Sequence, residues 1–409
     1  MPNAVEVTPI GAAEFAALML PFGPYPPLIA VGCSGGPDSL ALTRLVDAWA
    51  RTRGGAVLAL IVEHGLRLES AAEARVLGEG LARAGIVSRI LRLALAPGPA
   101  LQERARTARR AALLAACREA GALHLLLGHH AEDQAETVLF RALRGSGPRG
   151  LAGMAPLSVA ADALILRPLL GMPRARLAAT LRGWSIAPLL DPSNVDPRFA
   201  RARLRAAETQ AEATTAPAVP AFARRRARMA AEDTARVIAA IRLLPEGCAA
   251  IDPAALGQDA VARRVMAALI RTVSGVGHAP PQVAVAGLLA RGSGTLGGAA
   301  WLRGGRWLVR EAAAIRDGSM PWDGRFRAIV PLPEGMALSA LGVDAGRFRG
   351  RARHLPAAAL AALPALRRVA DGTLVLVPHL AYRHPDMAEQ FPLIFAPLSG
   401  PLTECHASM

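Results

Sequence analysis

The sequence predicts an α/β fold class: a parallel sheet with helices on both faces, followed by a mostly helical domain and a small mixed C-terminal region. Four apolar runs of strand length occur in the first half of the chain, at 28–31, 57–62, 88–93 and 123–127. Segments with helical periodicity alternate with them, near 40–51, 71–84 and 103–120. Continuous apolar strands separated by helices are typical of a parallel sheet buried on both faces. Ligands of such sheets bind at the carboxyl ends of the strands, so the polar residues that follow these runs are the candidate site residues.

A change of composition divides the chain beyond this region. The stretch 207–220 is rich in Ala, Thr, Pro and Gln, which is typical of a linker. Helical patterns then continue to about 246, from 258 to 274 and from 280 to 291, with a small β element near Trp301 and Trp307. We therefore expect a first domain, a linker, a mostly helical domain and a small C-terminal region of unassigned fold, over 1–206, 207–220, 221–319 and 320–409.

The charge of the chain points to a polyanionic partner. The 409 residues carry 47 Lys and Arg against 32 Asp and Glu, a formal net charge of +15, and the sequence contains no lysine. Arginine binds phosphate through two parallel hydrogen bonds, so RNA is a plausible partner. A GC-rich genome would also replace lysine by arginine, but it explains the excess over acidic residues less well.

Cysteine usage and hydropathy limit the class of protein further. The cysteines are widely dispersed and form no C-x-x-C pair, which argues against a disulfide framework, a zinc ribbon or an iron–sulfur site; they are Cys33, Cys117, Cys248 and Cys405. The sequence has neither a secretory signal pattern nor a run of about 18 apolar residues. We expect a soluble cytoplasmic protein with no membrane partner.

A glycine-rich turn between the first strand and the first helical pattern is the most informative segment. Its residues are Ser34, Gly35, Gly36, Pro37, Asp38 and Ser39. It offers backbone N–H groups and two hydroxyls at a helix N-terminus, where partial positive charge collects and phosphate binds. It lacks the lysine of a Walker-type loop. The alternative, an ordinary connection in an α/β fold, does not account for this fixed order of residues.

A second cluster, G-H-H-A-E-D-Q-A-E-T, begins where the fourth strand ends and enters a helix. His129 and Asp133 are four residues apart, and Asp133 and Glu136 are three apart, so these side chains are neighbours on a helix that begins early. A histidine beside carboxylates can move a proton near neutral pH, and Asp38 and Asp133 could hold Mg²⁺ on a pyrophosphate. Alternatively, the carboxylates only complement the helix N-terminus.

Other polar segments are weaker candidates. His64 closes the second strand, where nucleotide contacts are common, but a solvated histidine in a turn fits equally well. Two basic segments, at 141–150 and 190–205, could contact an RNA backbone or could be solvated helix faces. Their candidate contact residues are Arg144, Arg149, Asn194, Arg201 and Arg205.

The ordered motifs resemble those of a known family. The turn S-G-G-P-D-S is similar to the loop of the PP-loop ATP pyrophosphatases, which have the adenine nucleotide alpha hydrolase-like fold. With V-E-H-G-L-R, G-H-H-A-E-D-Q-A-E-T, L-R-G-S-G-P-R-G-L-A-G-M, R-P-L-L-G-M-P-R and D-P-S-N, the segment from about 28 to 205 resembles the tRNA(Ile)-lysidine synthetases. Three residues depart from the family pattern: Glu63 replaces Asp, Phe199 replaces Tyr and Ala202 replaces Asn.

The resemblance implies a reaction. The family uses ATP to adenylate the C2 carbonyl oxygen of the wobble cytidine in tRNA(Ile) with the anticodon CAU, and free L-lysine then displaces AMP to give lysidine. ATP is thus the implied co-substrate, Mg²⁺ the implied cofactor, and the catalytic residues are Asp38, His129 and Asp133. The second half is expected to contact the tRNA body. Glu136 and the five basic-segment residues named above are expected to face the substrate, and a homodimer is an open alternative to a monomer.

The resemblance implies roles for individual residues as well. The segment Ser34–Ser39, with His64, would bind ATP, and Asp38 would orient the metal ion or the loop. Asp133 or His129 would bind or deprotonate the lysine amine. Alternatives are another PP-loop enzyme that modifies tRNA, such as a thiolase, an amide-forming synthetase for a small molecule, and an RNA-binding protein without catalytic activity.

Overall fold

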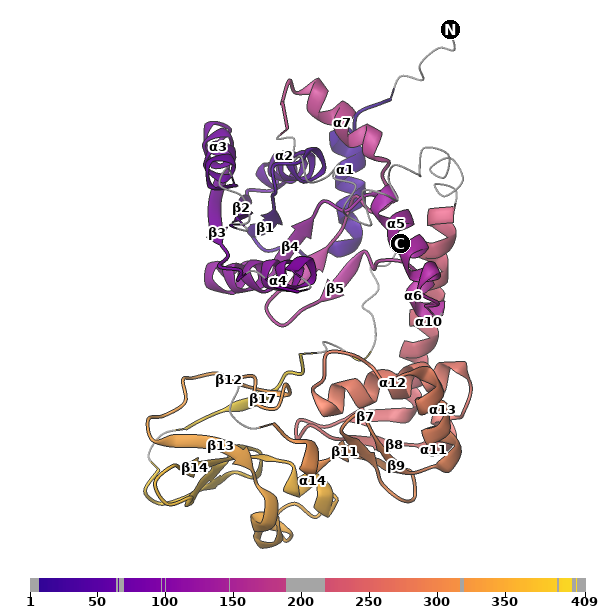
Figure 1. Ribbon diagram of the computed structural model, residues 1–409, viewed down its shortest axis with the longest axis vertical. Helices are drawn as coiled ribbons and strands as arrows, with labels where there is room; N and C mark the ends of the chain where they lie inside the picture. The colour runs from indigo at the N-terminus through magenta and orange to yellow at the C-terminus, as the bar shows by residue number, and fades with distance from the viewer. Residues whose placement is uncertain are drawn as a thin grey trace. The chain divides into compact units, whose positions relative to one another are not determined.

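The chain contains two compact units. The computed structural model describes residues 7–63, 65, 70–96, 98–99, 101–146, 148–188, 218–316, 320–387, 390–398 and 402. Unit 1 comprises Met1–Met229 with Cys405–Met409, and unit 2 comprises Ala230–Glu404 (Figure 1). The boundary between them falls within helix α10 (Ala218–Ala240), and most of the expected linker at 207–220 lies outside the described residues.

Unit 1 is built on a six-stranded sheet of order β3-β2-β1-β4-β6-β5. The four strands expected from the sequence are present as β1 (Leu28–Gly32), β2 (Ala56–Glu63), β3 (Val87–Arg92) and β4 (His124–Leu127). Two further strands are β5 (Leu157–Val159) and β6 (Leu164–Leu166). The pairs among β1, β2, β3, β4 and β6 are parallel, and only the edge strand β5 runs antiparallel to its neighbour.

Helices cover both faces of this sheet, as the sequence predicts. They are α1 (Ala12–Met19), α2 (Pro37–Arg51), α3 (Ser70–Arg83), α4 (Leu101–Ala120), α5 (Ala131–Leu143), α6 (Pro148–Leu151) and α7 (Arg174–Gly183). Successive side chains of a strand point to opposite faces. Ile29 and Val31 accordingly join a core with α1, α2, α3 and α7, whereas Ala30 joins a second core with α4.

The sheet order creates a switch in chain direction between β1 and β4. From β1 the chain proceeds to β2 and β3 on one side, and from β4 it proceeds to β6 on the other. The loops that leave the carboxyl ends of β1 and β4 therefore diverge from neighbouring strands, and ligands of open α/β sheets bind at such a point. Both of the informative sequence clusters, at 34–39 and 128–137, begin at this switch point.

Unit 2 combines helices with antiparallel sheets. After α10 come α11 (Pro253–Leu256), α12 (Ala260–Ser274) and α13 (Gln282–Arg291). A five-stranded sheet packs with them and consists of β7 (Ile241–Leu243), β8 (Ala249–Ile251), β9 (Gly294–Leu296), β10 (Ala299–Trp301) and β11 (Trp307–Arg310). The helix expected to continue to about 246 ends at Ala240, because the chain there enters β7 of this sheet.

The region 320–409, which the sequence left unassigned, contributes further strands to unit 2. A four-stranded antiparallel sheet contains β13 (Met336–Ala340), β14 (Pro364–Arg368), β15 (Leu374–Val377) and β16 (Tyr382–Arg383). Strands β12 (Phe326–Ala328) and β17 (Leu393–Phe395) pair separately, and a short helix, α14 (Ala357–Ala361), packs nearby.

Candidate functional site

The glycine-rich loop after β1 is held closed by its own side chains. Ser39, in the first turn of α2, accepts a hydrogen bond from the Ser34 backbone N–H at 3.0 Å and donates one to the Gly36 carbonyl at 3.1 Å. The hydroxyls of Ser34 and Ser39 are 3.1 Å apart. Gly35 adopts a φ of 83°, a left-handed conformation that favours glycine. The loop therefore presents its backbone to a ligand at the N-terminus of α2, where anions bind favourably.

The loop after β4 lies directly against this first turn of α2. A Cβ atom on Gly128 would be 3.0 Å from the Asp38 carbonyl oxygen and 3.0 Å from the Ser39 Cα atom. Only glycine leaves room for this approach of two backbones, because both contacted atoms belong to the main chain. The two clusters that the sequence singled out are thus in contact.

His130 lies at the centre of the cluster, and its side chain is buried. Its Nε2 atom is 3.5 Å from Asp38 Oδ2 and 3.4 Å from Asp133 Oδ2, and its Nδ1 atom is 2.9 Å from Glu132 Oε2. Burial acts to lower the pKa of His130, but hydrogen bonds to Asp38 and Glu132 and the charge of Asp133 outweigh it and raise the pKa to about 9. His130 is therefore an imidazolium at neutral pH, held among three carboxylates.

Glu132 connects this imidazolium to the N-terminus of α7. Its two carboxylate oxygens accept hydrogen bonds from the Arg174 backbone N–H at 3.1 and 3.0 Å. The Arg174 Nε atom in turn lies 3.5 Å from Asp38 Oδ1. Although burial opposes it, bonding to His130 lowers the pKa of Glu132, so the carboxylate stays ionised. Residues from α2, α5 and α7 therefore fix one another's orientation.

His129, which the sequence analysis selected as catalytic, has different surroundings from His130. Helix α5 begins at Ala131, so His129 precedes the helix and does not lie on a helix face with Asp133. Burial, with the positive charges of Arg167, Arg109 and Arg106, lowers the pKa of His129 to about 3. The expectation that His129 and Asp133 share a helix face is therefore wrong, because it depends on an earlier helix start.

The remaining predicted residues fall into three groups. Pro37 is the first residue of α2, Glu136 is buried on α5, and Arg144 follows α5 with its guanidinium 4.2 Å from the centre of the Phe140 ring. Arg149 lies in α6, and its side chain is outside the described part of the structure. Four predicted positions are outside the described residues altogether: His64, Asn194, Arg201 and Arg205.

Three residues of the cluster were not selected from the sequence: His130, Glu132 and Arg174. The sequence did contain a signal for His130: two consecutive histidines follow the strand, and capping a helix N-terminus does not require a pair of histidines. The signal for Arg174 was its place in the motif R-P-L-L-G-M-P-R, which follows β6. Only the tertiary structure distinguishes the roles of the two histidines.

The donor set is suitable for Mg²⁺ only together with a nucleotide. Asp38 and Asp133 both approach the cation on His130, so two carboxylates converge on one place. Within the described ranges, no group of three or more His, Cys, Asp or Glu residues is arranged to hold a metal ion. Mg²⁺ usually binds one or two carboxylates and completes its shell with phosphate oxygens and water. Asp38 and Asp133 fit that pattern.

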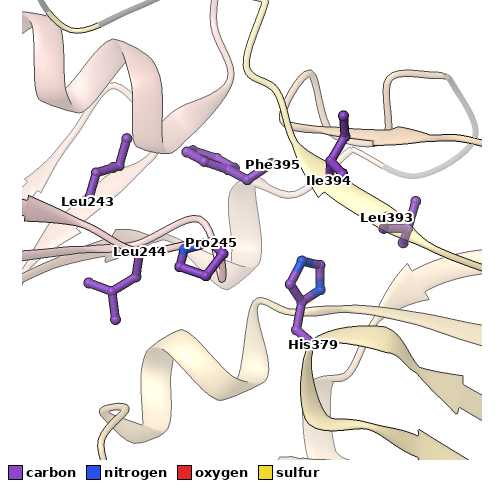
Figure 2. Close-up of a pocket in the computed structure, with 7 residues that line it drawn as sticks. All are labelled: Leu243, Leu244, Pro245, His379, Leu393, Ile394 and Phe395. Carbon is purple, nitrogen blue, oxygen red and sulfur yellow. The ribbon is translucent and has the colours of Figure 1, made fainter.

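Unit 2 contains a hollow of another kind. It is lined by Leu243, Leu244, Pro245, His379, Leu393, Ile394 and Phe395 (Figure 2). This lining is largely apolar and offers neither a carboxylate nor an arginine, so it does not match a nucleotide phosphate. Across the described ranges, no helix has the length and apolar character needed to cross a bilayer.

Comparison with known proteins places the chain in a family. A PP-loop domain matches residues 12–211. The tRNA(Ile)-lysidine synthase of Bradyrhizobium sp. (strain BTAi1) is 47% identical over 201 residues, which cover 48% of this chain and 56% of that protein. The one from Rhodopseudomonas palustris (strain CGA009) is 42% identical over 274 residues, 63% of this chain and 77% of that protein.

A solved structure, the U34-tRNA thiolase NcsA from Methanococcus maripaludis, aligns with a TM-score of 0.42 and 16% identity, covering 51% of this chain and 77% of that one. This likeness is too weak to bear on function. The chain matches 56% of the length of the Bradyrhizobium relative and 54% of that of a relative from Novosphingobium aromaticivorans. It matches 77% of the length of the Rhodopseudomonas relative. Because this chain covers 77% of the Rhodopseudomonas relative at 42% identity, it belongs to the tRNA(Ile)-lysidine synthase family.

Proposed function

We propose that this chain joins L-lysine to C2 of the wobble cytidine of tRNA(Ile) with the anticodon CAU, at the expense of ATP. In the first step the C2 carbonyl oxygen attacks the α-phosphorus of ATP, and the bond to diphosphate breaks. In the second step the lysine ε-amine attacks C2, and the bond to AMP breaks. The product, lysidine, pairs with adenosine. We also propose that the reaction takes place in the cytoplasm, where its substrates meet.

One observation supports this proposal most strongly: the glycine-rich loop and the carboxylate cluster are in contact at the switch point of the sheet. The Gly128 backbone lies against the first turn of α2, and His130 approaches both Asp38 and Asp133. A phosphate-binding loop and a set of acidic residues at one strand edge are the parts that nucleotidyl transfer needs. Membership of the tRNA(Ile)-lysidine synthase family supports the choice of tRNA(Ile) and lysine as substrates.

For the first step, the chain supplies positioning and charge. The loop Ser34–Ser39, through backbone N–H groups at the N-terminus of α2 that do not bond within the loop, such as that of Gly36, would hold the departing diphosphate. Mg²⁺ bound by Asp38 and Asp133 would neutralise phosphate charge. The ionised Glu132 keeps the imidazolium of His130 in place, so the Asp38 carboxylate is held by His130 and Arg174 before ATP arrives.

For the second step, the lysine ε-amine must lose a proton before it can attack, because the ammonium form has no lone pair. We assign the binding and deprotonation of this amine to Asp133 rather than to His129. The low pKa of His129, about 3, makes that imidazole a weak base, and its surroundings are cationic. Asp133 carries the negative charge that attracts an ammonium group.

We further propose that unit 2 contacts the body of the tRNA, since a single base cannot identify one tRNA among many. The high content of arginine is consistent with an RNA backbone as partner. The target base must leave the stack of the anticodon loop to reach the sheet edge.

The test is incorporation of radiolabelled lysine into acid-precipitable tRNA in the presence of ATP and Mg²⁺. The isoleucine tRNA with the CAU anticodon is expected to be labelled, and the elongator methionine tRNA is the control. If AMP is released but the tRNA is not labelled, the chain adenylates the tRNA, and a nucleophile other than lysine takes part in the second step. Absence of both signals would favour an RNA-binding protein without catalytic activity and would contradict the proposal.

A further inference from the structure

A buried arginine lies at the carboxyl end of β6. The Arg167 side chain is 9% exposed and follows Leu166, the last residue of β6. Its Nη1 atom donates to the Ala155 carbonyl at 2.8 Å and to the Ser158 hydroxyl at 3.0 Å. Its Nε atom is sealed from solvent and has no hydrogen-bond partner. Within the described ranges, Arg167 forms no ion pair, and an unpaired buried charge is costly.

Arg109, on α4, is a second such residue. It is half-buried, and it makes neither a hydrogen bond nor an ion pair with any residue that the structure describes. Its charge acts on Cys33, which follows β1, and on His129, which follows β4. Arg109 therefore reaches the same edge of the sheet as the glycine-rich loop and the carboxylate cluster.

His129 adds an unsatisfied polar atom to this place. Its Nδ1 atom is buried and has no hydrogen-bond partner. Burial, followed by the positive charges of Arg167, Arg109 and Arg106, holds it in the neutral form. Burial, followed by the like charges of Arg110, Arg226 and Arg106, also lowers the pKa of Arg167 to about 10. The group thus concentrates positive charge.

The arginines extend from the buried edge of the sheet towards solvent. Arg106 and Arg110 are exposed on α4, one turn apart and beside Arg109. Arg226, on the part of α10 that belongs to unit 1, donates hydrogen bonds to the carbonyls of Ala152 and Gly153. Five guanidinium groups are more than the phosphates of one bound nucleotide require. A row of arginines that leads out to the surface suits a chain of phosphates.

We propose that Arg109 and Arg167 form a subsite for a phosphate group of the RNA backbone, next to the nucleotide that is modified. Arg109 contacts the phosphate, Arg167 supplies the second positive charge, and Arg106 and Arg110 guide the neighbouring phosphates. The subsite lies at the carboxyl ends of β4 and β6, beside the loop that takes ATP at β1. This inference rests on the proposed function for its RNA substrate.

The test compares the variants Arg109→Gln and Arg109→Lys with the full-length chain, using filter binding to the CAU-anticodon isoleucine tRNA without ATP or lysine. Loss of one charge-assisted contact is expected to weaken binding about tenfold and to reduce the salt dependence by about one phosphate contact. The lysine variant should retain part of the affinity, because it keeps the charge but not the two-pronged geometry. Arg118→Gln is the matched control, since Arg118 is exposed on the same helix and paired with Asp162.

A second arm identifies the source of the phosphate. Inorganic diphosphate is titrated as a product inhibitor of lysine incorporation, at saturating tRNA, by the wild-type chain and by Arg109→Gln. An unchanged inhibition constant together with weakened tRNA binding supports an RNA phosphate. Weakened inhibition with unchanged tRNA binding overturns that assignment and places the departing diphosphate at Arg109.

Thermal unfolding separates ligand binding from a structural role. Because Arg109 makes no ion pair with any residue that the structure describes, Arg109→Gln should melt at the wild-type temperature or above it. A lower melting temperature together with wild-type affinity for tRNA would overturn the proposal. Binding is measured without the chemical step, so a wild-type chain that binds tRNA but incorporates no lysine would contradict the proposed function and not the subsite.

Discussion

At the scale of single residues, the site depends on two adjacent histidines with opposite electrostatic surroundings. His130 lies among Asp38, Glu132 and Asp133, which favour its protonated form. Burial, followed by the charges of nearby arginines, favours the neutral form of His129. Two consecutive residues therefore differ in their surroundings: His130 contacts carboxylates, whereas His129 lies beside the arginines of the proposed subsite. The sequence could identify the pair but could not assign these roles, since the groups that distinguish the two histidines come from distant segments of the chain: Arg109 and Arg167 near His129, and Asp38 near His130.

The pH dependence of stability follows from these two groups. The fold raises the pKa of His130 from 6.5 to about 9, so its stabilising contribution is complete below pH 6.5 and is lost as pH rises through 9. In metal-free protein we expect the free energy of unfolding to fall on the order of 3 kcal/mol across this interval. Urea unfolding at a series of pH values measures it. His130→Gln should remove this slope, and an unchanged slope would contradict the assignment.

The opposite sign applies to His129. Its pKa is lowered from 6.5 to about 3, so its contribution is present above pH 6.5 and is lost as pH falls through 3. The variant His129→Gln should therefore alter the acid limb of the same stability curve and leave the alkaline limb unchanged.

Asp133 is the residue on which the second step depends. We expect Asp133→Asn to reduce lysine incorporation at least about 100-fold, since the amide carries no charge to attract the ammonium group and is not a base. The measurement is labelled lysine in tRNA over time. Glu119→Gln is the control, because Glu119 forms an exposed pair with Arg89 on unit 1. Normal turnover by Asp133→Asn would refute the role given to Asp133.

At the scale of elements, the site exists because β4 brings its following loop against the N-terminus of α2. Much of this arrangement was predictable, because buried parallel strands are continuously apolar and glycine-rich turns mark their carboxyl ends. The strands β5 and β6 were not predicted, since each has three residues and too little periodicity. The start of α5 was also not predictable, although it decides which histidine faces Asp133.

The contact between Gly128 and α2 gives a prediction at this scale. In Gly128→Ala the new methyl group would meet the backbone of Asp38 and Ser39 at 3.0 Å, so the two loops must separate. We expect a loss of about 1–3 kcal/mol in unfolding free energy and a weaker affinity for ATP. Urea unfolding and ATP titration measure the two effects. Gly80→Ala, at a helical position with open space, is the control, and equal behaviour of the two variants would refute the argument.

A buried ionic cluster connects elements of unit 2. Asp323 accepts hydrogen bonds from Arg310, at the end of β11, and from Arg325, and both guanidinium groups are buried. Replacing Asp323 by Ala should cost about 3–5 kcal/mol, because two buried cations lose their counter-ion. The loss is measured by urea unfolding, with the fluorescence of the tryptophans of unit 2 as the signal. Asp371→Ala, which removes an exposed pair with Arg368 and an exposed hydrogen bond from the Thr373 backbone N–H, should cost much less than Asp323→Ala.

At the scale of the whole molecule, two compact units divide the proposed work between chemistry and recognition. Unit 1 holds the loop, the carboxylates and the arginines of the proposed subsite, and the net charge of +15 suits a polyanionic partner for the chain as a whole. The central strands β1 and β2 and the helices α2, α3 and α4 of unit 1 were predictable because they follow clear apolar runs and helical periodicity. The region 320–409 was not, because its short strands are interrupted by Pro and Gly and derive their order from packing.

The most direct test of the account is mass spectrometry of the nucleosides in the isoleucine tRNA after incubation with the chain, ATP, Mg²⁺ and lysine. We predict that the wobble cytidine is replaced by its lysine adduct, that one AMP is released for each adduct, and that the elongator methionine tRNA is unchanged. An unmodified wobble cytidine, or a product at this position that contains no lysine, would contradict the proposed function.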